Sequence, residues 1–178
     1  MRPAQEIVRF YGGTGTDDRG RSLAEVQEWP DSSLESVHDF IQWLFPLRER
    51  SGVNPRAPIL DEEIIAQFRA SRELQKNLML SFVRMLRFYG LEVRHKPRLR
   101  IVQGSIFQER AREWMSPGNH NYLRITRILK SLSSLGLEEE ARKFFECLSD
   151  IYDQQDKRNV LISPETFQYW KAAVPLPR

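Results

Sequence analysis

Two stretches of this sequence decide its fold class: His38 to Pro46, which reads HDFIQWLFP, and His120 to Leu129, which reads HNYLRITRIL. Each places aromatic and branched apolar residues at helical spacing beside His, Asn or Arg. This pattern is typical of a helix that buries one face and exposes a polar edge. Neither stretch contains a catalytic signature, so both predict structure before they predict chemistry.

Helix start signals recur along the rest of the chain. Ser22, with Glu25 three positions later, forms a capping box, Asp61 is an N-cap candidate, and Ser163 precedes a proline that suits the first helical position. Apolar spacing and these signals predict helices at 22–29, 31–45, 61–89 with a break near 70–72, 105–115, 120–135, 138–153 and from 163 onward.

The segment between residues 91 and 104 is the least helical part of the chain. Its branched residues, with Pro97 between them, predict a short hairpin or an extended crossing. A chain of 178 residues can bury one core, since a domain of ~150 residues buries about 70% of its unfolded surface. The sequence therefore predicts an all-α, single-domain, irregular bundle of about six to eight helices, with room for one short β-hairpin near residues 91–104.

Composition indicates a soluble protein of the cytoplasm. Hydrophobic residues make up 40% of the chain and charged residues 29%, which is an ordinary balance for a globular domain. The first ten residues have no apolar run of the signal-peptide type, and no stretch approaches the roughly 18 apolar residues of a transmembrane helix. The single cysteine, Cys147, cannot form an internal disulfide and is predicted to be a buried core residue.

Charge is unevenly distributed although the net charge is only +3. Residues 22–40 contain five acids and no Lys or Arg, whereas residues 84–112 contain eight Lys or Arg and two acids. The densest basic run supports a nucleic-acid hypothesis, in which phosphate contacts come from Arg94, Lys96, Arg98 and Arg100 of the basic region 94–112. A solvated basic loop is the simpler interpretation, because no aromatic residue is interleaved for base stacking.

A polar stripe is predicted on the helix that begins at His120. On a helical wheel His120, Arg124 and Arg127 stand at i, i+4 and i+7, so they share one face. Guanidinium groups at this spacing suit a carboxylate, a phosphate or a carbonyl-rich peptide. The alternative is that these arginines pair with acids of residues 22–40 and hold the bundle together.

Together with residues of the first half of the chain, this stripe defines the predicted ligand site. The site would bind a peptide or a small anion and consists of Trp43, Arg48, Asn54, His120, Arg124 and Arg127. No nucleophile motif, paired-carboxylate pattern or metal-ligand spacing accompanies it. We therefore predict a non-enzymatic binding domain with no catalytic residues, no metal and no cofactor.

Several ordered segments resemble one known family. They are Phe10-Tyr11, Asp18 to Trp29, HDFIQWLFPL at 38–47, Asn54 to Pro58, MLRFYGL at 85–91 and HNYLRITRILKSLSSLGL at 120–137. In this order they are similar to the conserved domain of the opioid growth factor receptor family. The resemblance covers roughly Phe10 to Leu148, and predicts an N-terminal extension at 1–9, the conserved domain at 10–150, and a C-terminal helix and tail at 151–178.

The resemblance implies an all-helical domain and a binding activity. In animals the family binds the opioid peptide enkephalin and is located at the nuclear envelope and in the nucleus, so peptide binding is the implied function. The sequence lacks the long, repeat-bearing C-terminal extension of the animal receptors, which predicts a compact, stand-alone member of microbial type.

Overall fold

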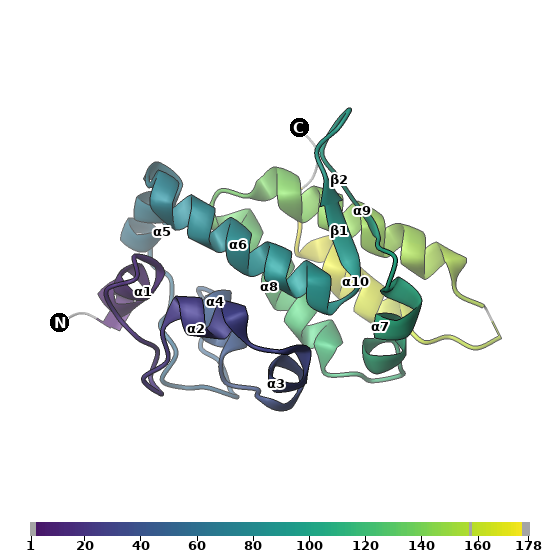
Figure 1. Ribbon diagram of the computed structural model, residues 1–178, viewed down its shortest axis with the longest axis horizontal. Helices are drawn as coiled ribbons and strands as arrows, with labels where there is room; N and C mark the ends of the chain where they lie inside the picture. Colours follow the sequence, from purple (N-terminus) through teal and green to yellow (C-terminus); the bar gives the residue numbers. More distant parts are fainter. Residues whose placement is uncertain (1–2, 157, 176–178) are drawn as a thin grey trace. The chain divides into compact units, whose positions relative to one another are not determined.

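A computed structural model of the chain describes residues 3–156 and 158–175, and these form ten helices and one two-stranded sheet (Figure 1). The elements are α1 (Pro3–Tyr11), α2 (Leu23–Glu28), α3 (Asp31–Ser36), α4 (Ile41–Leu44), α5 (Glu62–Ala70), α6 (Arg72–Phe88), β1 (Leu91–Arg94), β2 (Arg100–Gln103), α7 (Phe107–Trp114), α8 (Asn121–Leu135), α9 (Glu138–Gln154) and α10 (Pro164–Ala172). The predicted helical fold with one hairpin is confirmed. None of the helices in the described ranges combines the length and the apolar character needed to cross a bilayer.

The chain divides into two compact units. Unit 1 comprises Met1–Arg84 with Ser134–Gly136, and unit 2 comprises Met85–Ser133 with Leu137–Arg178. The boundaries fall inside α6 and at the end of α8. The division predicted from the resemblance, at residues 10 and 151, remains a prediction.

Three predicted helix starts are confirmed in atomic detail. The side chains of Ser22, Asp61 and Ser163 each accept a hydrogen bond from the backbone N–H three residues later, at 3.2, 2.8 and 3.1 Å. Each bond satisfies a donor that has no partner within its own helix. The predicted break between α5 and α6 is also present, because Ser71 adopts an extended conformation at φ −96° and ψ 114°.

One predicted helix of the first half is wrong, and one observed helix was not predicted. The single helix predicted at 31–45 is divided into α3 and α4, because Val37 is extended and the Asp39 carbonyl accepts a hydrogen bond from the Asn54 side chain at 3.1 Å. The predicted helices also did not include α1, which runs to Tyr11, with Ile7 and Phe10 fully buried. These differences make the helices shorter and more numerous than predicted.

The core of unit 1 is aromatic. Phe10 meets Trp43 with ring centroids 5.4 Å apart, and Tyr11 meets Phe68 at 5.0 Å, both edge to face. The Tyr11 hydroxyl donates to the Leu44 carbonyl. Aromatic pairs of this geometry contribute beyond the apolar area that they bury, and they join α1, α4 and α5.

A chain of aromatic rings runs through the core of unit 2. Tyr89 meets Trp114 at 5.3 Å, Trp114 meets Tyr122 at 6.5 Å, and Tyr122 meets Trp170 at 5.7 Å. Each buried indole N–H has an acceptor: Trp114 donates to the Tyr89 carbonyl and Trp170 to the Tyr122 carbonyl, both at 3.2 Å. The rings fix the end of α6, α7, α8 and α10 against one another.

The hairpin lies across α9, and its tip extends past that helix (Figure 1). β1 and β2 are antiparallel, with Leu91 opposite Gln103 and Arg94 opposite Arg100. Leu91 and Ile101 are buried on the face toward α9, and Gln103 donates to Gln154 of that helix at 3.3 Å. Pro97 lies in the turn, as predicted.

Candidate functional site

Two of the predicted site residues meet at one carboxylate in unit 1. Oδ1 of Asp18 accepts a hydrogen bond from the Trp43 indole at 2.7 Å and from the Asn54 amide at 3.2 Å. Trp43 and Asn54 are only 1% and 5% exposed. Sequence reasoning missed Asp18, which lies in the Gly- and Asp-rich loop after α1 and brings these two side chains together.

The same loop holds an arginine–aspartate network. The Asp17 carboxylate accepts from the backbone N–H groups of Arg19 and Arg21, both at 2.9 Å, and from Nε of Arg21 at 2.6 Å. The Asp39 carboxylate forms ion pairs with Nε of Arg19 at 3.0 Å and with Nη1 of Arg21 at 2.9 Å. Burial alone would raise the pKa of Asp39, but hydrogen bonds and charge from Arg21 and then Arg19 outweigh it and lower that pKa.

A polar pocket of about 590 Å³ opens beside this network. It is lined by α1, the loop that follows and α4, through Glu6, Arg9, Thr14, Gly15, Thr16, Asp17, Asp18 and Trp43. Gly15 is needed here, since a Cβ at this position would stand 3.0 Å from the Cβ of Arg9. Two of its carboxylates are engaged within the fold: Asp17 by Arg21, and Asp18 by Trp43 and Asn54.

Arg48 is placed differently from Trp43 and Asn54. It lies in the loop after α4, where its guanidinium pairs with Glu62 at the start of α5. Both side chains are largely exposed, at 50% and 81%, and exposed ion pairs of this kind contribute little to stability. Arg48 is therefore available to a ligand, but no shared hydrogen bond joins it to Asp18.

The other three predicted residues belong to unit 2. Arg124 is 4% exposed and donates from Nη1 to the Asn121 side chain at 3.2 Å, while Arg127 and His120 are half-buried. The Asn121 amide also lies 3.4 Å from Nε2 of His120. A joint site of all six residues remains a prediction.

A groove that the sequence did not suggest lies within unit 2. It has a volume of about 390 Å³ and is lined by Gln103, Phe107, Gln108, Ala111, Arg112, Met115, Ile151, Gln154, Gln155, Asp156, Asn159 and Leu161. The residues from α7 and its C-cap Met115 stand at i, i+1, i+4, i+5 and i+8, which is one face of a helix. Gln103 of β2, the last turn of α9 and the loop after it supply the rest of the lining.

Hydrogen bonds hold both walls of the groove in place. The Gln155 side chain accepts from the N–H groups of Leu161 and Ile162 and donates to the Ile162 carbonyl, at 3.2, 3.0 and 3.0 Å. The Tyr122 hydroxyl donates to the Leu161 carbonyl at 3.0 Å. On the other wall, Arg110 donates to the Phe88 carbonyl at 2.7 Å. A groove fixed in this way needs little ordering when a ligand binds.

Sequence reasoning could have found half of this groove. The apolar face of α7 is visible as Phe107, Ala111 and Met115 at a spacing of four. That the end of α9 lies beside this face depends on the aromatic core of unit 2, which no local pattern reveals. Arg110, counted in the basic region, is structural, because its guanidinium also lies 4.9 Å from the Phe88 ring centroid.

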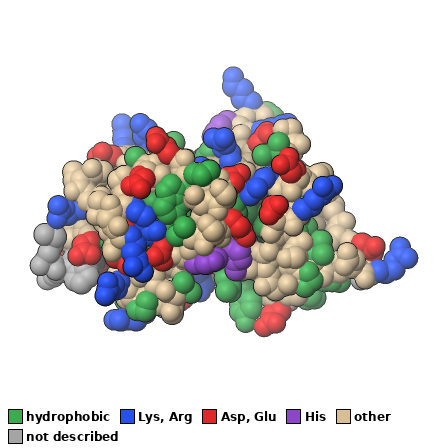
Figure 2. Space-filling model, turned by 60° about the horizontal axis from the view of Figure 1, so that its bottom comes forward, with side chains coloured by type: hydrophobic (Ala, Val, Ile, Leu, Met, Phe, Trp, Pro, Cys, Tyr) green, Lys and Arg blue, Asp and Glu red, His purple; other side chains and the backbone are tan. Residues whose placement is uncertain are grey.

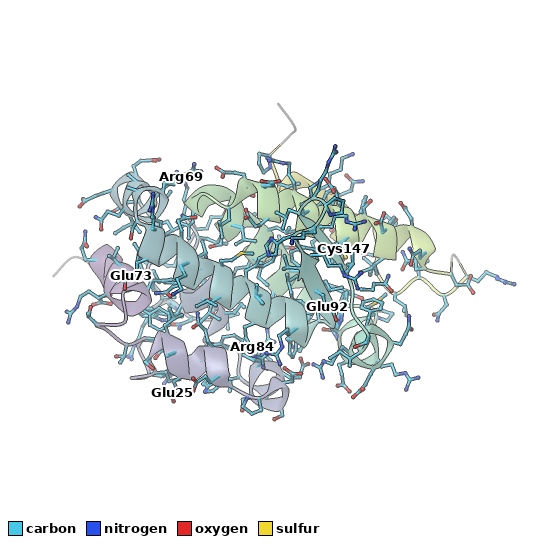
Figure 3. The ribbon with its side chains drawn as sticks, turned by 45° about the horizontal axis from the view of Figure 1, so that its top comes forward. Glu25, Arg69, Glu73, Arg84, Glu92 and Cys147 are labelled. Atoms are coloured by element: carbon cyan, nitrogen blue, oxygen red, sulfur yellow. The ribbon has the colours of Figure 1, made fainter. Side chains whose placement is uncertain are left out.

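The remaining titratable groups of note are buried. Burial, and secondarily Asp150, raises the pKa of the Cys147 thiol to about 12, and burial raises the pKa of Tyr122 to about 12. Cys147 is 5% exposed on the inner side of α9, as its prediction as a core residue requires (Figure 3). Within residues 3–156 and 158–175 no cluster of three His, Cys, Asp or Glu residues could hold a metal ion.

These features define a mostly helical domain with one β-hairpin, an arginine–aspartate network and a preformed apolar groove. The chain belongs to the opioid growth factor receptor (OGFr) conserved region family, whose model matches residues 9–174. The family predicted from the ordered segments is thus confirmed.

Named relatives share this region with the chain. The opioid growth factor receptor of Mus musculus is 42% identical over 115 residues, and that of Homo sapiens is 43% identical over 117 residues. These matches cover 64% of this chain but 18% and 17% of the receptors. The opioid growth factor receptor-like protein 1 of Xenopus tropicalis is 43% identical over 105 residues, which is 59% of this chain and 20% of that protein. No solved structure matches.

Proposed function

We propose that this chain is a binding domain for a short peptide, that it catalyses no reaction, and that the peptide binds in the groove between α7 and the end of α9. One observation carries the proposal: a preformed apolar groove whose two walls end in side chains of opposite charge. Arg112 comes from α7 and Asp156 from the loop after α9. A short peptide with free termini offers a carboxylate and an ammonium group for these two residues.

The chemistry of the lining suits a peptide in other ways. Phe107 and Ile151 are buried beneath the groove, and Met115 is half-buried at its edge. Apolar and aromatic side chains of a ligand bury their surface on such a floor, and thioether groups adapt to varied ring shapes. Gln108 and Asn159 are exposed at the rim, where amide groups can pair with peptide backbone.

The comparisons support the same class of ligand. Relatives of this region are named receptors for the opioid growth factor. The groove volume of about 390 Å³ lies in the range of small-ligand sites.

Calorimetric titration with enkephalin, and with a scrambled peptide of the same composition, tests the proposal. Ala111→Trp should fill the groove and abolish binding, and Arg112→Ala should weaken binding about tenfold, which corresponds to about 1.4 kcal/mol. Arg87→Ala is the control, because Arg87 is exposed in the same unit and does not line the groove.

Arg48→Ala separates this groove from the site predicted from the sequence. The groove proposal expects enkephalin to bind the Arg48→Ala variant normally. Binding that is lost in Arg48→Ala and kept in Ala111→Trp would overturn the groove and favour the six-residue site. Thermal unfolding of each variant confirms that the fold is retained.

A further inference from the structure

We propose that the tip of the β1–β2 hairpin binds the phosphate backbone of double-stranded DNA, independently of the peptide groove. The binding surface consists of Arg94, Lys96, Arg98 and Arg100, which are all exposed. Figure 2 shows Lys and Arg side chains projecting at the top, where the hairpin lies.

The first argument is a cross-strand pair of like charges. The register places Arg94 directly opposite Arg100, on the face of the hairpin that points away from α9. Like charges in this position repel each other and destabilise a hairpin. The folded chain offsets the repulsion only weakly, through Glu92, whose carboxylate lies 3.8 Å from Arg94 on the same strand. An anion bound between the two guanidinium groups removes the repulsion.

The second argument is the lack of internal partners around the turn. Lys96, Arg98 and Arg100 form no ion pair with any residue in the described parts of the chain. The base of the hairpin, in contrast, is firmly held: Leu91 and Ile101 are buried, and the Gly104 N–H donates to the Gly90 carbonyl at 2.9 Å. The base of the hairpin is therefore fixed, while the cationic groups of the tip have no carboxylate partner at the turn. Figure 3 labels Glu92, the acid of strand β1.

The shape of this surface favours duplex DNA over other anionic partners. The major groove of B-DNA admits a two-stranded β-ribbon, whereas the major groove of an RNA helix is too deep and narrow for side chains. The tip holds no Phe, Tyr or Trp for stacking on single strands. None of the exposed large apolar side chains in the described ranges lies between residues 91 and 103, and a surface without such side chains is a poor anchor in a bilayer.

Fluorescence anisotropy of the full chain with a labelled duplex of about 20 base pairs tests the proposal across a salt series. Four phosphate contacts predict a slope of log K against log salt of about −3.6, and Arg98→Ala with Arg100→Ala should reduce that slope to about −1.8. The same double variant should weaken binding at least tenfold. The matched control is Arg50→Ala with Arg56→Ala, which removes the same charge from an exposed loop of unit 1.

The Arg100→Glu variant distinguishes loss of a DNA contact from loss of the fold. It replaces the repelling pair with opposite charges, so the thermal midpoint should rise while DNA binding falls. Equal loss of binding in the loop control would show a general charge effect and overturn the proposal. Absence of duplex binding at low salt, or binding only to anionic vesicles, would also overturn it. Ala111→Trp should leave DNA binding unchanged, so failure of the peptide proposal is distinguishable from failure of this one.

Discussion

Two arginine-rich segments of this protein have opposite surroundings. In the loop of unit 1, Arg19 and Arg21 bind Asp17 and Asp39, and Arg21 also lies 5.3 Å from the Trp29 ring centroid. In the hairpin of unit 2, Arg94 and Arg100 stand opposite each other, and carboxylates are scarce. The same side chain thus stabilises the fold in one region and offers charge to solvent in the other.

The difference teaches that charge density in a sequence does not by itself indicate a binding surface. What distinguishes the two regions is whether each guanidinium has acceptors within the folded chain. The first region should therefore respond to mutation through stability, and the second through binding.

The largest effect is expected for Asp17→Ala. The Asp17 side chain is fully buried and accepts three hydrogen bonds from its own loop. Its removal leaves Arg21 without its closest partner, so the free energy of unfolding should fall by about 3–5 kcal/mol. Urea denaturation followed by circular dichroism measures this loss. Arg98→Ala, at the exposed tip of the hairpin, is the control and should stay within about 0.5 kcal/mol of the unchanged chain.

Asp39→Asn should have a smaller and pH-dependent effect. It weakens two charge-assisted hydrogen bonds, which predicts a loss of about 1.5–3 kcal/mol at pH 7. Because the pKa of Asp39 is lowered in the folded chain, its contribution is complete above the unfolded carboxyl pKa of about 3.9 and disappears as the pH falls through the folded value. The two proteins should converge in stability in strong acid, and a difference that persists there would contradict this account.

Trp43→Phe is expected to cost about 1 kcal/mol. The smaller ring keeps most of the apolar contact with Phe10 but removes the N–H that donates to Asp18. Asn54 still donates to the same oxygen, so the carboxylate keeps a partner. Thermal unfolding measures the change, and a loss of 3 kcal/mol or more would show that the indole fills a role beyond this hydrogen bond.

The smallest expected effect is a gain in stability, whereas the preceding substitutions are expected to destabilise the chain. Arg100→Glu should raise the free energy of unfolding by about 0.2–1 kcal/mol, because it pairs opposite charges across the hairpin. Arg87→Glu, an exposed change outside the hairpin, is the control. A destabilised Arg100→Glu variant would mean that Arg94 and Arg100 do not repel each other in the folded chain.

The sequence predicted those features of the fold that depend on neighbouring residues. The caps at Ser22, Asp61 and Ser163 follow from local hydrogen bonding, and the end of the helix predicted at 120–135 follows from the backbone freedom of the next residue, Gly136, which has φ +100°. The interruption between α3 and α4 was not predictable in this way. It depends on Asn54, a residue 15 positions later, which binds the Asp39 carbonyl.

In the candidate site, too, the features that depend on residues distant in sequence were not predictable. Trp43 and Asn54, two residues of the predicted ligand site, both donate to Asp18, but this carboxylate lies in a loop whose sequence suggests only a turn. The groove of unit 2 depends on contacts between α7 and the residues after α9 that no local pattern encodes. Placement of Arg48 and of the His120 stripe in one ligand site stays a prediction.

Gly90 packs so closely against the start of α7 that the residue type at this position determines the shape of the groove. It has φ +77°, and a Cβ at this position would stand 2.8 Å from the Cα of Phe107. Its carbonyl also anchors the base of the hairpin through Gly104. A relative with any other residue at this position must shift the first turn of α7, and with it the groove floor. The residue type at position 90, Gly or not, therefore predicts from sequence alone which relatives keep this groove shape.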